Sequence, residues 1–314
     1  MFEINKNNLN GFEEFVIHNI NTGDRCSIVP AFGVNIRELV LDNESIIDGY
    51  KTIERFYLNE GYKSSFLIPF PNRILNGEYL FDGNKYQLPK NDISNALHGF
   101  FFNKSTVLKK KIIQKSSASL TFSYQYDGTY TGYPFPFIVD IMITLNNEGF
   151  KCCIDILSQD KKMPIGVGWH PYFRFSDETV NNLLLKIPEC KFIKADNEKI
   201  PNGELVPYSS FNKPKSLKGR YFDTGFLINS KKAVIELHSK EKQKIIKVEQ
   251  NRSNNSNCFF QIYIPAERKS IAIEPMTCAA NSFNNKIGLE ILNKGERLST
   301  LLKVSIIESR NKYS

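Results

Sequence analysis

The sequence predicts an all-β fold with few and short helices. Short stretches alternate apolar and polar residues, turn signals rich in Gly, Asn and Pro separate them, and no long stretch keeps a helical period. Because strands do not alternate with helices, the pattern favours a sandwich or a barrel. The length of 314 residues indicates an enlarged one. No internal repeat and no long linker interrupts the chain, so we expect residues 1–314 to form a single domain.

The clearest strand is "SLTFSYQY" (119–126), in which every second residue from Leu120 to Tyr126 is apolar and the others are Ser, Thr or Gln. A half-buried strand requires this alternation, because successive side chains point to opposite faces. Further strands are expected at 137–145, 151–157, 232–239, 244–250, 258–264, 270–274 and 302–309. The turn signals between strands include "FDGN", "LNNEG" and, at 251–257, "NRSNNSN".

The lysine-rich run "LKKKIIQK" (108–115) is expected to be an exposed edge strand, where lysine discourages pairing with another chain. The net charge of +8 comes from 41 Lys and Arg against 33 Asp and Glu. Since the other lysines are scattered rather than clustered, we expect no nucleic-acid partner.

No stretch approaches the roughly 18 consecutive apolar residues of a membrane span, and the first residues lack the layout of a signal peptide. We therefore expect a cytoplasmic protein with no membrane partner. The six cysteines show no CxxC pair and no zinc-ligand spacing, which predicts neither a metal site nor a disulfide scaffold, but reduced and mostly buried thiols. They are Cys26, Cys152, Cys153, Cys190, Cys258 and Cys278.

Polar residues in rigid, apolar surroundings mark the first two candidate site segments. In residues 70–89, Pro71 and Gly77 bracket Asn72 and Arg73, and an arginine there can present a planar fork of donors to neighbouring oxygens. The second segment, "NALHGF" (95–100), places His98 directly before a glycine.

Two further segments each place a titratable residue directly before a proline. "MPIGVGWHPYFRF" (163–175) holds His170 after Trp169, the only tryptophan, and the following proline biases His170 towards an extended conformation. In "IAIEPMTCAANSF" (271–283), Glu274 ends an apolar strand. A carboxylate in such surroundings costs free energy unless a partner or a function compensates. Asp223 lies between these segments, in "RYFDTGF".

Each candidate also has a purely structural interpretation, so none decides the function alone. Either histidine can be a hydrogen-bonded structural residue, and the aromatic residues around His170 can be core. Glu274 can pair with Arg73 or a lysine, and Asp223 can be a turn aspartate.

Taken together and in this order, the segments resemble the aldose 1-epimerase family, the galactose mutarotases. The resemblance covers most of the chain, roughly residues 70–285, with weaker agreement at 29–41. The motifs that carry it are "NRILNGEY", "LHGF", "GYPFPFIVDIMITLNNEG", "GVGWHPYF", the Asp223 segment and "IEPMTCAANSF". The chain differs from the better-known members at Arg174–Phe175 after the His-Pro-Tyr-Phe motif and at Pro275 after the glutamate.

The resemblance implies a β-supersandwich of antiparallel sheets with a shallow, open sugar site. It implies that His170 is the general acid and Glu274 the general base. It implies that Arg73, His98 and Asp223 bind the substrate. Asn72, next to Arg73, and Trp169, next to His170, are further candidate substrate-binding residues. For Trp169, stacking on a sugar face and packing behind His170 are both open.

The chemistry of anomer exchange fits one acid and one base. A proton leaves the C1 hydroxyl while another reaches the ring oxygen, and the open aldehyde then rotates and recloses on its other face. No metal, nucleotide or covalent intermediate is required, so no cofactor is expected. At their reference pKa values of about 4.3 and about 6.5, a Glu and a His can carry opposite charges near neutrality.

Two other functions remain open. A hexose-6-phosphate 1-epimerase would need a basic phosphate pocket, and four cations shortly before Asp223 are the candidates: Lys213, Lys215, Lys218 and Arg220. A non-catalytic sugar-binding protein would need neither proton-transfer residue. The expected partner in each case is a small sugar, and the sequence leaves open whether the chain is a monomer or a homodimer.

Overall fold

The computed structural model describes residues 1–252 and 257–309 and confirms the all-β class. Strands dominate, all the strand pairs within the sheets are antiparallel, and the described residues contain two short α-helices, α1 (Ile53–Leu58) and α2 (Ser282–Asn285). Within the described ranges, no helix is long and apolar enough to cross a membrane. All six cysteines are free thiols, four of them buried. The turn expected at 251–257 lies mostly outside the described residues.

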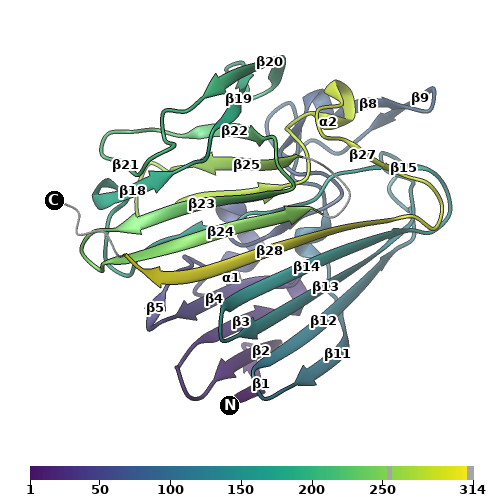
Figure 1. Ribbon diagram of the computed structural model, residues 1–314. Coiled ribbons are helices and arrows are strands. Elements are labelled where there is room, and N and C mark those ends of the chain that lie inside the picture. The colour runs from purple at the N-terminus through teal and green to yellow at the C-terminus, as the bar shows by residue number, and fades with distance from the viewer. Residues whose placement is uncertain (253–256, 310–314) are drawn as a thin grey trace.

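The largest sheet has nine strands and forms the broad face of the molecule in Figure 1. In spatial order it contains β11 (Val107–Ile113), β12 (Ser117–Tyr126), β13 (Phe137–Asn146), β14 (Gly149–Ser158), β28 (Arg297–Glu308), β24 (Lys244–Arg252), β23 (Lys232–Ser239), β18 (Leu183–Lys186) and β21 (Lys215–Ser216). The lysine-rich run lies in β11, which is an exposed edge strand as predicted.

A second sheet of eight strands carries the candidate site. Its spatial order is β20 (Pro201–Tyr208), β19 (Cys190–Ala195), β22 (Asp223–Ile228), β25 (Cys258–Tyr263), β26 (Ile271–Met276), β16 (Gly168–Trp169) and β6 (Phe66–Leu67), with β17 (Tyr172–Phe173) also paired to β26. Three of these strands are only two residues long, and they bring the His170 segment beside the Glu274 strand.

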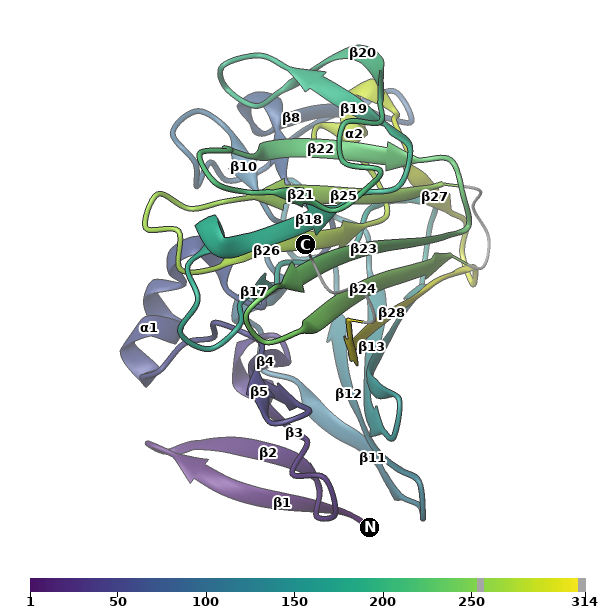
Figure 2. The same cartoon turned by 60° about the vertical axis from the view of Figure 1, so that its left-hand side comes forward.

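The N-terminal residues form a five-stranded sheet of β1 (Phe2–Leu9), β2 (Phe12–Asn19), β3 (Arg25–Val29), β4 (Asn35–Leu41) and β5 (Glu44–Ser45). Three two-stranded ladders complete the fold: β7 (Arg73–Ile74) with β10 (Ala96–Leu97), β8 (Glu78–Phe81) with β9 (Asn84–Gln87), and β15 (Met163–Ile165) with β27 (Glu290–Leu292). The β1–β2 hairpin lies at the end of the molecule away from β19 and β20 (Figure 2).

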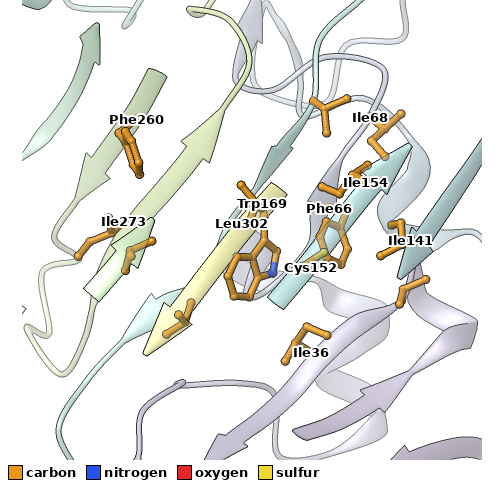
Figure 3. Close-up of a cluster of buried hydrophobic side chains, with 14 of the residues drawn as sticks. Ile36, Phe66, Ile68, Ile141, Cys152, Ile154, Trp169, Phe260, Ile273 and Leu302 are labelled. Carbon is orange, nitrogen blue, oxygen red and sulfur yellow. The ribbon is translucent and has the colours of Figure 1, made fainter. Parts of the chain in front are cut away.

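The predicted alternation is visible in the burial of β12, where Leu120, Phe122 and Tyr126 are buried and the residues between them are not. One cluster of buried residues extends along the chain from Phe2 to Val304. Part of it surrounds Trp169 in Figure 3, with side chains from several strands converging on the indole.

Candidate active site

Four neighbouring strands present the candidate site on one face of the eight-stranded sheet. Gly225, Gln261 and Glu274 lie directly opposite one another across β22, β25 and β26. Two residues away along each strand, a second row runs across Asp223, Tyr263, Ala272 and Tyr172, the last of these in β17. Residues two apart in a strand share a face, so both rows point the same way.

Glu274 and His170 form the centre of the site. The Nε2 atom of His170 lies 3.4 Å from Oε1 of Glu274, and the two side chains are 7% and 2% exposed. The backbone of His170 is held by Ser65 and Ser64: its N–H donates to the carbonyl of Ser65 (3.0 Å), and its carbonyl accepts from the N–H of Ser64 (2.8 Å). The short strands on either side therefore fix where the imidazole lies.

Each member of this pair keeps a buried polar atom without a hydrogen-bond partner in the described part of the chain: Nδ1 of His170 and Oε2 of Glu274. Unsatisfied buried polar atoms are costly and uncommon, and they are typical of places where a ligand or water supplies the partner. Among residues 1–252 and 257–309, Glu274 forms no ion pair with Arg73 or a lysine, so the expectation that it merely pairs with one of them is wrong.

Burial shifts the two pKa values in opposite directions. It raises the pKa of Glu274 well above its usual range; the negative charge of Asp223 adds to this rise and the positive charge of Arg73 opposes it. Burial lowers the pKa of His170 to about 3. The expectation of ordinary values near 4.3 and 6.5 is therefore wrong, because it ignored desolvation, which favours the uncharged form of both groups.

His98 and Asn72 bind each other through two hydrogen bonds. The N–H of Asn72 donates to Nδ1 of His98 (3.0 Å), and the N–H of His98 donates to the carbonyl of Asn72 (2.9 Å). Burial lowers the pKa of His98 well below its usual value, and the charges of His170 and Arg73 act in the same direction. His98 is thus neutral with its proton on Nε2, which makes it a hydrogen-bond donor. Its ring meets that of His170 edge-on, with centroids 5.2 Å apart.

Arg73 is oriented by Asp92, a residue that the sequence did not single out. The Nε atom of Arg73 donates to Oδ2 of Asp92 (2.6 Å), and Nη1 lies 3.4 Å from Oδ1 of Asn72. Asp92 therefore fixes the orientation of the guanidinium through its Nε atom. The positive charge of Arg73 lowers the pKa values of both His98 and Glu274.

Asp223 borders a cavity of about 180 Å³, whose lining includes neither Glu274 nor His170. Its Oδ1 accepts from Nε2 of Gln261 (2.8 Å), and its Oδ2 lies 3.5 Å from Nζ of Lys199. Asn72, Lys199 and Gln261 also line this cavity. Sequence reasoning missed Gln261 and Lys199; the signal available for Gln261 was a polar residue between Phe259 and Tyr263 on one face of an otherwise apolar strand.

Trp169 lies in the core and not in the site. Its side chain is fully buried, its indole stacks with Phe150 (centroids 5.4 Å apart) and Phe66 (6.1 Å), and its Nε1–H donates to the carbonyl of Ser64 (3.2 Å). Figure 3 shows it among apolar side chains. Of the two interpretations, packing behind His170 is the correct one, because no face of the ring is open to a sugar.

The four cations considered for phosphate binding lie elsewhere. None of Lys213, Lys215, Lys218 and Arg220 lines the cavity beside Asp223, and Lys215 lies in β21 at the end of the nine-stranded sheet. In residues 1–252 and 257–309, no group of three or more His, Cys, Asp or Glu side chains could hold a metal ion.

Comparison with known proteins gives one family. The family model described as aldose 1-epimerase matches residues 17–305. The uncharacterized protein YihR of Escherichia coli is 27% identical over 291 residues, covering 87% of this chain and 88% of its own. Rat galactose mutarotase is 25% identical over 166 residues, covering 52% of this chain and 47% of its own.

Solved structures give the same fold. A galactose mutarotase-like protein from Clostridium acetobutylicum superposes with a TM-score of 0.87 at 23% identity, covering 98% of this chain and 99% of its own. The galactose 1-epimerase from Lactobacillus acidophilus superposes with a TM-score of 0.83 at 16% identity, covering 99% and 100%. The antiparallel β-supersandwich expected from the sequence is therefore confirmed.

Proposed function

This chain belongs to the aldose 1-epimerase family, and from that premise we propose that it is itself an aldose 1-epimerase, a mutarotase that interconverts the α and β anomers of a free cyclic aldose. The observation that carries the proposal is the buried pair of Glu274 and His170, 3.4 Å apart, each with one unpartnered polar atom. Ring opening needs an acid and a base within reach of one sugar, and these two side chains lie close enough together to serve it.

In the proposed mechanism, the Glu274 carboxylate takes the proton of the C1 hydroxyl while the His170 imidazolium gives a proton to the ring oxygen. The C1–O5 bond breaks, and the product is an open-chain aldehyde with a protonated Glu274 and a neutral His170. Rotation about the C1–C2 bond presents the other face of the aldehyde. The O5 hydroxyl then attacks C1, His170 takes back its proton, and Glu274 returns a proton to O1.

Desolvation favours the direction of both first transfers. Glu274 and neutral His170 share one added proton both before and after ring opening. Before it, the proton is on His170 and both groups are charged; after it, the proton is on Glu274 and both are uncharged. Since burial raises the pKa of Glu274 and lowers that of His170, the uncharged arrangement is the more stable in this site. The charged arrangement from which ring opening starts is therefore the minor form of the pair, and desolvation favours the product of the two proton transfers over it.

The remaining polar groups suit hydroxyl recognition. Neutral His98 donates from Nε2, Arg73 donates from its terminal nitrogens, and Asp223 accepts. We propose that these three residues bind the sugar, with Asn72 positioning His98 and Gln261 positioning Asp223. The proposed reaction needs no cofactor. We also propose that residues 1–314 form one domain, because one cluster of buried residues includes side chains from nearly the whole described chain.

The experiment is a survey of anomer exchange. Freshly dissolved α-anomers of glucose, galactose, xylose and glucose 6-phosphate are followed by polarimetry and NMR, with and without EDTA. Acceleration of at least one neutral sugar, unaffected by EDTA, is expected. Sugar binding without acceleration would instead identify a binding protein, and a preference for glucose 6-phosphate would identify a phosphosugar epimerase.

A further inference from the structure

A second hollow, of about 560 Å³, lies against β17 and β25. Tyr172 and Tyr263 line it, and their rings meet edge-on with centroids 6.4 Å apart. The other lining residues come from the segment 48–63, which includes α1, and from 265–267 after β25. Gly61 in this segment has a φ of +68°, and a Cβ there would lie 3.2 Å from the Tyr172 hydroxyl. Glycine therefore leaves room for that hydroxyl at the wall of the hollow.

The hollow adjoins the catalytic pair. The ring of Tyr172 lines the hollow and also stacks on the imidazole of His170, with centroids 5.0 Å apart. Tyr263 lies two residues from Gln261 on the same face of β25, so its row is about 7 Å from the row that contains Glu274. The hollow therefore begins one side chain away from His170.

The charges lining the hollow balance. Three are acidic (Asp48, Glu60, Glu267) and three are basic (Lys51, Arg55, Lys63). Two pairs neutralise each other internally, Lys63 with Asp48 and Arg55 with Glu60. Among the described residues, Glu267 and Lys51 form no ion pair. A phosphate or sulfate site needs an excess of cations, which this hollow lacks.

The lining chemistry suits a neutral, polyhydroxylated ring. Tyr263 is half-buried and offers part of an apolar ring with a polar edge, whereas Tyr172 is 3% exposed and offers little surface. The Glu267 carboxylate accepts from hydroxyl groups, and Lys51 donates to them. The Glu267 charge also raises the pKa values of Tyr172 and Tyr263, although burial is the main cause for both. Glu267 lines the same hollow as both tyrosines.

We propose that this hollow is a second sugar-binding subsite and that the preferred substrate is a reducing disaccharide or longer saccharide. This rests on the proposed mutarotase function: the reducing residue lies at Glu274 and His170, where its ring opens and recloses, and the glycosidic bond stays intact. His170 faces the ring oxygen, whose neighbour C5 carries C6. A second residue linked through C6 would lie on the Tyr172 side, so isomaltose, a 1→6-linked glucose disaccharide, is the chosen probe.

The test compares isomaltose with glucose. NMR exchange spectroscopy at anomeric equilibrium gives kcat/KM for each, and the wild type is expected to prefer isomaltose about tenfold, the gain from one additional set of sugar contacts. Glu267→Ala removes an exposed hydroxyl acceptor and should reduce the preference to about twofold or less. Glu241→Ala, an exposed glutamate outside the hollow, should leave it unchanged. Thr52→Trp, which fills the hollow from its exposed rim, should abolish the preference.

Equal kcat/KM values for isomaltose and glucose in the wild type would overturn the subsite while leaving the mutarotase function intact. A preference that survives both Glu267→Ala and Thr52→Trp would also overturn it. If no sugar is accelerated, the proposed function fails instead, and titration calorimetry then tests the subsite alone. Tighter binding of isomaltose than of glucose, lost in Thr52→Trp, would support the subsite, and equal affinities would reject it.

Discussion

The imidazole of His170 lies nearly parallel to the ring of Tyr172, with an interplanar angle of 16° and centroids 5.0 Å apart. Since Nδ1 of His170 has no hydrogen-bond partner in the described residues, this stack orients the imidazole together with the edge contact of His98 and the approach of Glu274 to Nε2. Most oriented histidines instead rely on a carboxylate or carbonyl at the second nitrogen.

Tyr172→Leu should therefore lower kcat by about tenfold or more, because small misplacements of a catalytic group are costly. Tyr172→Phe keeps the stacked ring and should restore most of kcat. Steady-state mutarotation kinetics of both variants with a monosaccharide check this. Equal kcat values for the Leu and Phe variants would show that stacking does not position His170.

Glu274→Gln keeps the shape of the side chain but deletes the proton acceptor, and His170→Asn removes the titrating imidazole. Each change should lower kcat by about 10²–10⁴-fold with little change in KM. The double variant should lose less than the product of the two single effects, because the residues act as a unit. Polarimetry measures the rates, and circular dichroism checks the fold. A folded Glu274→Gln variant with near wild-type rate would refute the base assignment.

The pH profile of kcat/KM should be a broad bell. The productive pair holds one proton. It gains a second as the pH falls through the lowered pKa of His170, about 3, and loses its proton as the pH rises through the raised pKa of Glu274. The two limbs are properties of the coupled pair. A rate that instead falls between pH 6 and 7, as an ordinary histidine would dictate, contradicts the burial argument.

The basic limb of that bell should move in opposite directions in two variants. Asp223→Asn removes a negative charge that raises the pKa of Glu274, so the limb should shift to lower pH. Arg73→Gln removes a positive charge that lowers this pKa, so the limb should shift to higher pH. The position of the limb, rather than the maximal rate, is the quantity to compare, since both residues are also proposed to bind sugar.

Arg73→Lys keeps the positive charge but removes the planar fork that Asp92 orients. KM should rise by about tenfold, and the basic limb should stay close to that of the wild type because the charge is retained. Kinetics over a range of sugar concentrations separate the two effects. Unchanged KM and kcat would mean that the guanidinium does not contact the substrate.

The long strands could be predicted from the sequence, because alternation of apolar and polar residues indicates a strand with one buried face. The two-residue strands β6, β16 and β17 could not, because their pairing with one another and with β26 exists only in the tertiary structure. These short strands are nevertheless what holds His170 beside Glu274.

The candidate site was predictable where a local oddity marked it, as with a histidine and a glutamate each followed by proline. Asp92 and Lys199 could not be predicted as site residues, because no motif in their own segments marks them. Asp92 is placed by its ion pair with Arg73, and Lys199 by its ion pair with Asp223. The pKa shifts were also missed, because desolvation depends on what covers a side chain and not on its sequence neighbours.

Trp169, the only tryptophan, gives the protein a single indole fluorophore, next to His170 in the chain, which can be excited apart from the 14 tyrosines. Its emission arises from one dry, apolar environment, so the spectrum of the folded protein reports one position rather than an average. Loss of packing around Phe66 and Phe150 would expose the indole to water and shift its emission to longer wavelength. The indole and His170 both hydrogen-bond the Ser64 backbone, so the same signal reports loss of the packing that holds His170, without any added label.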